Sequence, residues 1–425
     1  MKTRATISAL LIAVTASLWT GAPASAATGP GSLIKLSCPN GAAADHPCKA
    51  VYYYGGDAKR HAFPNAKAYF TWYADFSGVQ TVTASFMASL PLGSNVTYRP
   101  GVKMVKFQTL DKVYAVGLGS ELRWVATEEV ARTLYGQDWN TKIDDVSDVF
   151  YTDYRFGADI AAASSYDKDA ELAAAATIDD GLESTHRDLR VDTVLGAFDI
   201  DMVKLRNDRF SMITDVAASS DCGDDCAVKS LAQYAQDDGA QIGIHGTYFC
   251  PPDYADCAGK TNSFLWPVYD TPSETMINAG SLPHHAGPMI AETKDGRRFN
   301  FHRSRDFGSS VPAFEGVYGE LQAAMANYPS LIEDGIVVVE SEAKLDENQK
   351  TVKATRGGIG WNGKSTFLVI ARAATVVDLA YIMKALGATE AMNLDGGGSS
   401  ALLYDGAYKV GPGRLLPNAI LFKRR

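Results

Sequence analysis

The octapeptide NLDGGGSS at residues 393–400 decides how this chain is interpreted. Three consecutive glycines permit positive φ angles and let a ligand approach the backbone closely. The N–H groups of such a turn can point together at an anion. Asp395, at the end of the preceding strand, would then face whatever binds there. The octapeptide predicts a turn that supplies both a carboxylate and anion donors; a tight hairpin with a solvated aspartate is the alternative.

The elements around this turn predict an α+β domain. Residues 375–386 predict an amphipathic helix that opens with a capping-box pattern at Thr375 and closes at Gly387. Residues 391–394 and 401–404 predict short strands on either side of the turn. Further strand-like runs cover 191–198, 241–245, 335–340 and 365–371, and a helix is expected over 227–238. Together they indicate a C-terminal domain, residues 191–425, with a mixed sheet.

A serine-hydrolase elbow is a rival interpretation of the turn, since residues 397–401 (GGSSA) nearly match its pattern. That elbow leads from a strand into a helix, whereas residues 401–404 predict a strand. In the α/β-hydrolase order the histidine follows the serine, but the last histidine here is His302. A different serine triad stays open. The sequence contains no P-loop, HExxH or EF-hand pattern.

The N-terminal part, residues 31–165, carries a weak twofold repeat. VYYY at 51–54 is echoed by VYAV at 113–116, and Arg60, Trp72 and Leu92 have counterparts at Arg123, Tyr135 and Phe156. Each copy opens with a strand pattern and a turn, followed by an aromatic-rich stretch of helical spacing. Two copies are too few for a solenoid, so we expect a small paired α+β module, joined by a linker at 166–190. Its aromatic residues suit either sugar stacking or a core.

The six cysteines fall into three local pairs. An even count in an exported chain favours disulfides, and we expect Cys38–Cys48, Cys222–Cys226 and Cys250–Cys257. Zinc is the alternative for the second pair, whose spacing suits two ligands. No histidine or cysteine follows that pair at the short interval a zinc finger requires.

The first 26 residues predict a signal peptide. Lys2 and Arg4 precede an apolar run, residues 7–19, that is short for a bilayer span, and residues 24–26 (ASA) offer a cleavage pattern. An uncleaved anchor is the alternative. The formal net charge of −9 argues against a protein that coats nucleic acid or anionic lipid. We therefore expect a secreted or cell-surface protein with no nucleic-acid partner.

The C-terminal half resembles the phosphodiester glycosidase family. The resemblance rests on RGGIG at 356–360, the helix ending in LGA at 386–388, and AMNLDGGGSS at 391–400. GTYF at 246–249, residues 328–335, and Arg414 with LPN at 416–418 are similar to further family segments. It covers about residues 190–425 and implies hydrolysis between a sugar anomeric carbon and a phosphate. Two departures leave the substrate open: His245 stands where the family usually has asparagine, and residues 250–257 look inserted.

The resemblance and the residue chemistry together assign site roles. Asp395 is expected to act at the anomeric carbon as nucleophile, base or cation stabiliser. Arg356 is expected to bind phosphate through its planar guanidinium, with a surface salt bridge as the alternative. His245 is expected to donate to phosphate or act as an acid, with a structural histidine as the alternative. Substrate contacts are assigned to Asn393, Gly396, Gly397, Gly398, Ser399, Thr247 and Arg414.

These assignments predict a secreted hydrolase that cleaves a sugar-1-phosphodiester in an extracellular glycan or glycolipid. No cofactor is predicted, and no ligand spacing demands a metal. The N-terminal module resembles a cell-wall or surface attachment module in composition alone. A non-catalytic cell-surface carbohydrate-binding protein and a serine-type esterase working through Ser399 are the competing functions.

Overall fold

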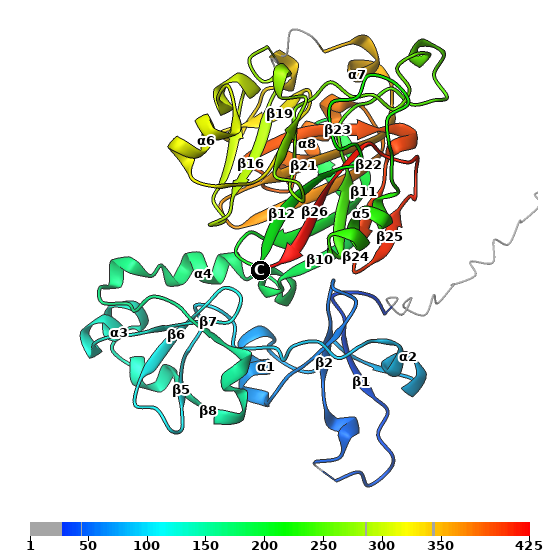
Figure 1. The fold of residues 1–425 in the computed structure, drawn as a ribbon. Helices are drawn as coiled ribbons and strands as arrows, with labels where there is room; N and C mark the ends of the chain where they lie inside the picture. The colour runs from blue at the N-terminus through cyan, green and yellow to red at the C-terminus, as the bar shows by residue number, and fades with distance from the viewer. Residues whose placement is uncertain (1–27, 44, 285–286, 342–344) are drawn as a thin grey trace, which may run out of the picture.

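Helices and sheets build two N-terminal units and one larger C-terminal domain (Figure 1). The computed structural model describes residues 28–43, 45–284, 287–341 and 345–425. The predicted signal peptide lies outside these residues. Across the described ranges, no helix is both long and apolar enough to cross a bilayer. The mixture of helices and mostly antiparallel sheets confirms the predicted α+β fold class.

The two N-terminal units share one connectivity. In each, the first strand pairs antiparallel with the second and parallel with the strand after the helix. The repeated segments VYYY and VYAV lie in matching strands, β2 and β6. The first unit comprises β1 (Leu33–Leu36), β2 (Tyr52–Tyr54), β3 (Arg60–Ala62), α1 (Ala66–Trp72), β4 (Val79–Val82) and α2 (Ala84–Ser89). The second comprises β5 (Met104–Phe107), β6 (Val113–Gly117), β7 (Glu121–Trp124), α3 (Glu128–Tyr135), β8 (Ile143–Val146) and β9 (Arg155–Phe156).

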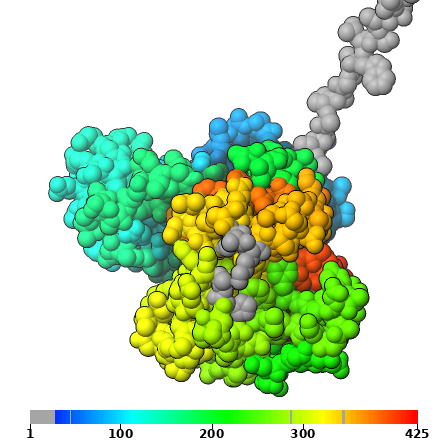
Figure 2. Space-filling model, turned by 90° about the horizontal axis from the view of Figure 1, so that it is seen from above, coloured from blue at the N-terminus to red at the C-terminus, as the bar shows by residue number. Residues whose placement is uncertain are grey.

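Many aromatic side chains of these units form their cores. The buried ones include Tyr53, Tyr69, Tyr98, Phe107 and Tyr114. Four others are exposed: Phe70, Phe76, Tyr151 and Phe156. Core packing therefore accounts for much of the aromatic enrichment, and sugar stacking stays a prediction for the exposed rings. The second unit projects beside the C-terminal domain (Figure 2, cyan).

The C-terminal domain contains three sheets, with the orders β10-β11-β22-β21-β23-β19-β20, β12-β26-β13-β24-β25 and β15-β14-β18-β16-β17. Its strands are β10 (Ser184–Thr193), β11 (Gly196–Arg206), β12 (Phe210–Val216), β13 (Ile242–His245), β14 (Val268–Asp270), β15 (Thr275–Ile277), β16 (Met289–Thr293), β17 (Arg298–Phe301), β18 (Leu321–Ala326), β19 (Ser330–Glu333), β20 (Ile336–Val337), β21 (Ala354–Trp361), β22 (Ser365–Ala374), β23 (Glu390–Gly396), β24 (Leu402–Tyr404), β25 (Ala407–Val410) and β26 (Asn418–Arg424). Its helices are α5 (Leu231–Asp237), α6 (Val311–Tyr318), α7 (Glu347–Thr351) and α8 (Val376–Ala385), and α4 (Lys168–Ala174) precedes the domain.

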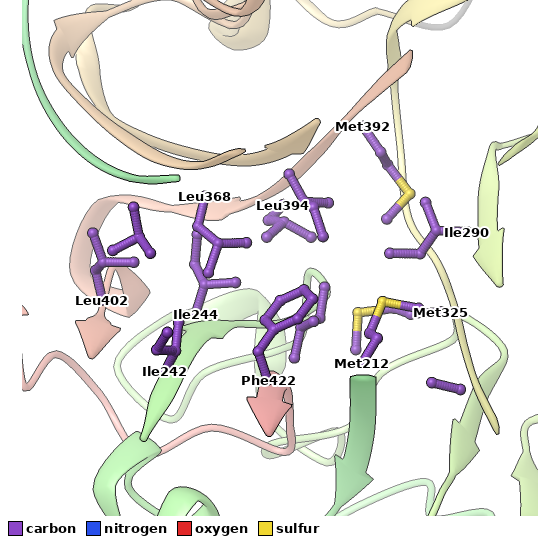
Figure 3. Packing of buried hydrophobic residues seen from close by; sticks show 14 of the residues in the cluster. Met212, Ile242, Ile244, Ile290, Met325, Leu368, Met392, Leu394, Leu402 and Phe422 are labelled. Atoms are coloured by element: carbon purple, nitrogen blue, oxygen red, sulfur yellow. The ribbon is translucent and has the colours of Figure 1, made fainter. Parts of the chain in front are cut away.

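The main core lies between the seven-stranded sheet and the two smaller ones. Met392 and Leu394 of β23 face Ile244, Phe422 and Met212 across this core (Figure 3). On the other side of the large sheet, α8 packs in a second cluster that includes Ala391. Because successive strand residues point to opposite faces, β23 is packed on both sides. This packing fixes the position of its C-terminal end, where Asp395 lies.

The helix predicted over 375–386 is confirmed as α8, with Thr375 as N-cap, a capping box to Asp378 and Gly387 at φ +86°. The prediction of one continuous strand over 191–198 is wrong. β10 ends at Thr193 and β11 begins at Gly196, because the chain turns at two exposed apolar residues and Gly196 adopts φ +131°. The run 335–340 forms only a two-residue strand, β20, and a 3-10 turn.

The boundary between module and domain also differs from the prediction. β10 begins at Ser184 and pairs with β11 along its length, so the predicted linker at 166–190 contains α4 and the first residues of the domain's sheet. The three predicted disulfides, Cys38–Cys48, Cys222–Cys226 and Cys250–Cys257, are confirmed. Cys222 and Cys226 therefore bond to each other and are not zinc ligands.

Candidate active site

Three strand ends meet at one edge of the domain: the last residues of β13 and β23 and the first residue of β26. β13 lies between β26 and β24, and the Asp395 N–H donates to the Gly246 carbonyl at 3.1 Å. A Cβ at Gly246 would lie 1.9 Å from Asn418 Oδ1, so glycine permits this close approach of β13 to β26. The octapeptide is thereby brought against GTYF, two segments that are about 150 residues apart in sequence.

The Asp395 carboxyl lies half-buried beside the glycine turn. Its Oδ1 accepts a hydrogen bond from the Gly396 N–H at 2.8 Å. Burial raises the pKa of Asp395 above its usual value, while a hydrogen bond from Ser399 and the charges of His245 and Arg414 act in the opposite direction. A carboxyl group with a raised pKa at the edge of a sheet suits acid–base or nucleophilic chemistry.

His245 is fully buried, and the main chain occupies both of its ring nitrogens. Nε2 lies 2.7 Å from the Asp395 carbonyl oxygen, and Nδ1 lies 3.2 Å from both the nitrogen and the carbonyl oxygen of Ala401. A carbonyl can only accept, so the Nε2–H donates to Asp395. A Cβ at Gly357 would lie 2.2 Å from the ring. The predicted contact of His245 with phosphate is therefore not available in this arrangement, and the ring supports the Asp395 backbone instead.

The guanidinium group of Arg356 is held by main-chain carbonyls. Nη2 donates to Asn348 at 3.1 Å and to Val352 at 2.7 Å, and Nε donates to Ala374 at 3.3 Å. These bonds connect β21 to α7 and to the end of β22. These bonds engage Nε and Nη2 of Arg356 in a structural role but not Nη1, so phosphate binding by Arg356 stays a prediction.

Arg414 is the arginine that the structure places against the glycine turn. Its Nη1 lies 3.5 Å from Ser399 Oγ, and a Cβ at Gly398 would lie 2.8 Å from its Cζ. Asp253 pairs with Nη2 at 2.5 Å, and the guanidinium lies 5.1 Å from the centre of the Tyr254 ring. The Cys250–Cys257 disulfide closes the loop that carries both partners. The segment that looked inserted thus positions a cation beside Asp395.

Tyr248 contributes a hydroxyl group that the sequence did not single out. Its oxygen lies 2.8 Å from Asn393 Nδ2 and 3.2 Å from Gln349 Nε2. Both partners donate, so the tyrosine's own proton is left for another acceptor. Burial raises the pKa of Tyr248, and the nearby Asp395 charge raises it further. In the sequence, only its place just after a strand end distinguishes Tyr248 from a core aromatic residue.

Asn393 and Thr247, both predicted to contact substrate, are buried beneath the site. Asn393 Nδ2 also lies 3.1 Å from the Tyr328 carbonyl, and its Oδ1 is buried without a hydrogen-bond partner among the described residues. The Thr247 hydroxyl accepts from Asn418 Nδ2 at 3.0 Å. Burial places both side chains as supports rather than as exposed contacts.

The glycines form the rim of the site. Gly397 adopts φ +57°, and residues 397–399 form a single 3-10 turn. The first N–H groups of such a turn have no partner within it, and donation from Gly397 and Gly398 to a ligand stays a prediction. Ser399 is fully buried beside Arg414. Since both ring nitrogens of His245 are occupied elsewhere, no Ser399–His245 pair exists to support the serine-esterase alternative.

No metal-binding cluster accompanies these groups in the described part of the chain, where nowhere do three His, Cys, Asp or Glu residues gather suitably. The site as described consists of the Asp395 carboxyl group, the Arg414 guanidinium with its partner Asp253, the Tyr248 phenol and the turn amides.

Comparison with known proteins matches residues 238–423 to the phosphodiester glycosidase family model. No curated protein matches the chain. Among solved structures, a hypothetical protein from Synechocystis is similar at 16% identity and a TM-score of 0.41, over 57% of this chain and 62% of that one. The zebrafish N-acetylglucosamine-1-phosphodiester alpha-N-acetylglucosaminidase catalytic domain, auto-inhibited by its pro-peptide, is similar at 14% identity and a TM-score of 0.44, over 57% and 83%. Both TM-scores are below 0.5, so the assignment of residues 238–423 to the phosphodiester glycosidase family rests on the family-model match.

Proposed function

We propose that this chain, whose residues 238–423 form a phosphodiester glycosidase domain, hydrolyses a sugar-1-phosphodiester in an extracellular glycan or glycolipid. The family match supports phosphodiester glycosidase activity in general. The more specific proposal is carried by one observation: the Asp395 carboxyl, the Arg414 guanidinium and the Tyr248 hydroxyl gather around one glycine turn. Export is part of the proposal, supported by the predicted signal peptide and by the disulfides.

The leaving group decides what each residue must do. A phosphodiester departs as a stable anion, so it requires charge stabilisation more than full protonation. Arg414 and the N–H groups of Gly397 and Gly398 hold the phosphate oxygens. Tyr248, with its oxygen already accepting two hydrogen bonds, donates its proton in a further hydrogen bond to the phosphate.

Asp395 acts on the sugar side of the bond that is cut, at the anomeric carbon. In its ionised form it stabilises the positive charge that develops at the anomeric carbon, either as a nucleophile or as the base that activates water. The Arg414 charge favours this ionised form, whereas burial opposes it. The carboxylate is therefore held at a pKa from which it can gain or lose a proton during turnover.

The remaining predicted residues position these three groups. His245 fixes the Asp395 carbonyl. Arg356 anchors α7, and Gln349 of α7 donates to the Tyr248 hydroxyl. Asn393 donates to the same hydroxyl from the other side. The N-terminal units attach the enzyme to a cell wall or surface in this proposal.

The test compares release of free sugar from a panel of sugar-1-phosphodiesters by wild type and Asp395→Asn. We expect kcat/KM to fall about 10³-fold or more with circular dichroism unchanged, because a neutral amide cannot stabilise the developing charge. Asp192→Asn, an exposed change of the same kind in the β10–β11 hairpin, should leave turnover within about twofold. Turnover that survives in Asp395→Asn would contradict the assignment of this residue. Saccharide binding with no turnover by wild type would favour the non-catalytic alternative.

A further inference from the structure

A cleft of about 980 Å³ lies between the N-terminal units and the C-terminal domain. It is lined by residues 92–97 of the first unit, by residues 118–120 and 152–155 of the second, and by the strand residues Ile242, Tyr404 and Phe422 of the C-terminal domain. The end of β26 reaches this junction, where the C-terminus is marked in Figure 1. Its volume and its place between domains are those of a ligand site.

The cleft lining has an excess of basic residues, whereas the whole chain has an excess of acidic ones. The protein has 40 basic against 49 acidic residues. The lining instead has more basic than acidic members: Lys59, Arg155, Arg206, Arg209, Lys423 and Arg424 against Asp57, Asp153, Glu183 and Asp405. A basic lining on an acidic protein concentrates an anionic ligand there.

Three of these arginines, Arg155, Arg206 and Arg209, lie close enough together for their positive charges to repel one another. Burial lowers the pKa of Arg155 and the charges of Arg206 and Arg209 lower it further, while its ion-pair partners Glu121 and Asp208, at 3.4 and 3.5 Å, act in the opposite direction. Arg206 is held by Asp208 through two bonds of 3.0 and 2.9 Å, and lies against Gly119, where a Cβ would be 1.4 Å from its Nη1. Its position is therefore set before any ligand arrives.

Arg209 retains hydrogen-bonding capacity at the cleft. Its Nε is buried without a hydrogen-bond partner among the described residues, and Glu183 Oε1 is an ion-pair neighbour at 3.8 Å. That separation exceeds a hydrogen bond. The Arg209 side chain is 34% exposed at the cleft, so an anion there meets the outer part of the guanidinium and not the buried Nε.

The rest of the lining suits a sugar chain rather than a bare anion. Ser94, Ser120 and Thr152 contribute hydroxyl groups, and Trp72 contributes an aromatic ring. Hydroxyl groups hydrogen-bond to sugar hydroxyls, and aromatic faces cover the apolar face of a sugar ring. The combination with arginines fits alternating sugars and phosphates.

The cleft is separate from the Asp395 site. β26 begins at Asn418, beside Thr247, and ends at Arg424 in the cleft. Seven residues of strand span roughly 20 Å. We propose that the cleft is a second, non-catalytic site that binds a glycan with phosphates in its backbone, away from the bond that is cut. The choice of that polymer rests on the proposed function.

The test measures binding of a soluble oligosaccharide with at least four glycosyl-phosphate repeats by calorimetry. The probe is compared with a neutral oligosaccharide of equal length and with inorganic polyphosphate. Arg209→Gln/Arg424→Gln removes two cations from the cleft, and Arg190→Gln/Arg305→Gln removes two exposed cations elsewhere. We expect the cleft variant to bind the glycosyl-phosphate probe about tenfold more weakly, with smaller salt dependence, and the control variant to bind normally.

Turnover of a small sugar-1-phosphodiester is measured on the same variants, and it should be unchanged in both. This readout separates the two proposals, because failure of the proposed function removes turnover in wild type and leaves the binding result intact. Unchanged affinity in the cleft variant would overturn the second site. Equal binding of the neutral oligosaccharide, or polyphosphate binding as tight as that of the glycosyl-phosphate probe, would overturn the ligand class.

Discussion

Burial raises the pKa of both Asp395 and Asp215. The groups around Asp215 interact with other groups of the protein, whereas some of those around Asp395 are left to face a ligand. Asp215 in β12 is enclosed by the protein: Lys229 Nζ lies 3.6 Å away, the charge of Asp238 raises the pKa of Asp215 further, and only 3% of the residue is exposed. Around Asp395, the Tyr248 proton and the turn amides are left for a ligand. A shifted pKa therefore marks a functional site only where neighbouring donors are not already satisfied by the protein.

The largest expected effect comes from removing the cation beside each carboxyl group. Arg414→Gln should lower kcat/KM about 100-fold, because the phosphate loses its charged partner. Lys229→Gln should leave kcat/KM within about twofold and lower the melting temperature, because it leaves Asp215 without its cation. Steady-state kinetics and thermal unfolding on both variants check this. Arg356→Gln serves as a second control for which arginine binds phosphate, and a larger kinetic loss there than in Arg414→Gln would reverse the assignment.

The tyrosines of the two regions give the next contrast. Tyr248→Phe should lower kcat/KM about tenfold with little change in stability, since its proton is expected to serve the substrate. Tyr234→Phe removes a hydroxyl that donates to the Leu416 carbonyl at 2.9 Å. It should cost about 1 kcal/mol in the free energy of unfolding and leave turnover intact. Denaturant titration and initial rates measure both quantities. Equal kinetic effects from the two variants would show that Tyr248 is structural.

The smallest effect is in pH dependence. The raised pKa of Asp215, at about 7, stabilises the protein fully below the ordinary carboxyl pKa, and this stabilisation is lost as pH rises to about 7. Asp215→Asn should therefore flatten the decline in melting temperature between pH 4 and 7 by about 2–6 °C. The raised pKa of Asp395 instead makes kcat/KM fall as pH drops through it, from a point above the usual carboxyl range. A variant with the wild-type slope would remove Asp215 as the titrating group.

Local patterns were sufficient for much of the fold. The capping box at Thr375, the strand–turn–strand around the glycines and the three short cysteine loops were predicted, because each depends on residues close in sequence. The hairpin at residues 194–195 was missed, since two exposed apolar residues there imitate a buried strand.

The site was harder to predict because its details depend on contacts between distant segments. The octapeptide indicated Asp395, but whether an arginine faces a ligand depends on which carbonyls lie near it. Arg356 meets the carbonyls of α7, and Arg414 meets Asp253 in a disulfide-closed loop. Tyr248 could not be distinguished by type from a core aromatic residue. Its two donors, Asn393 and Gln349, lie more than 100 positions away.

The place of β26 has a consequence for how this protein is made. β26 lies between β12 and β13 in its sheet, yet it follows β12 in the chain by about 200 residues. A ribosome must therefore synthesise residues up to 424 before that sheet can close. Until β26 joins the sheet, Thr247 lacks Asn418 and the cleft lacks Arg424, so neither site is complete before these distant segments come together.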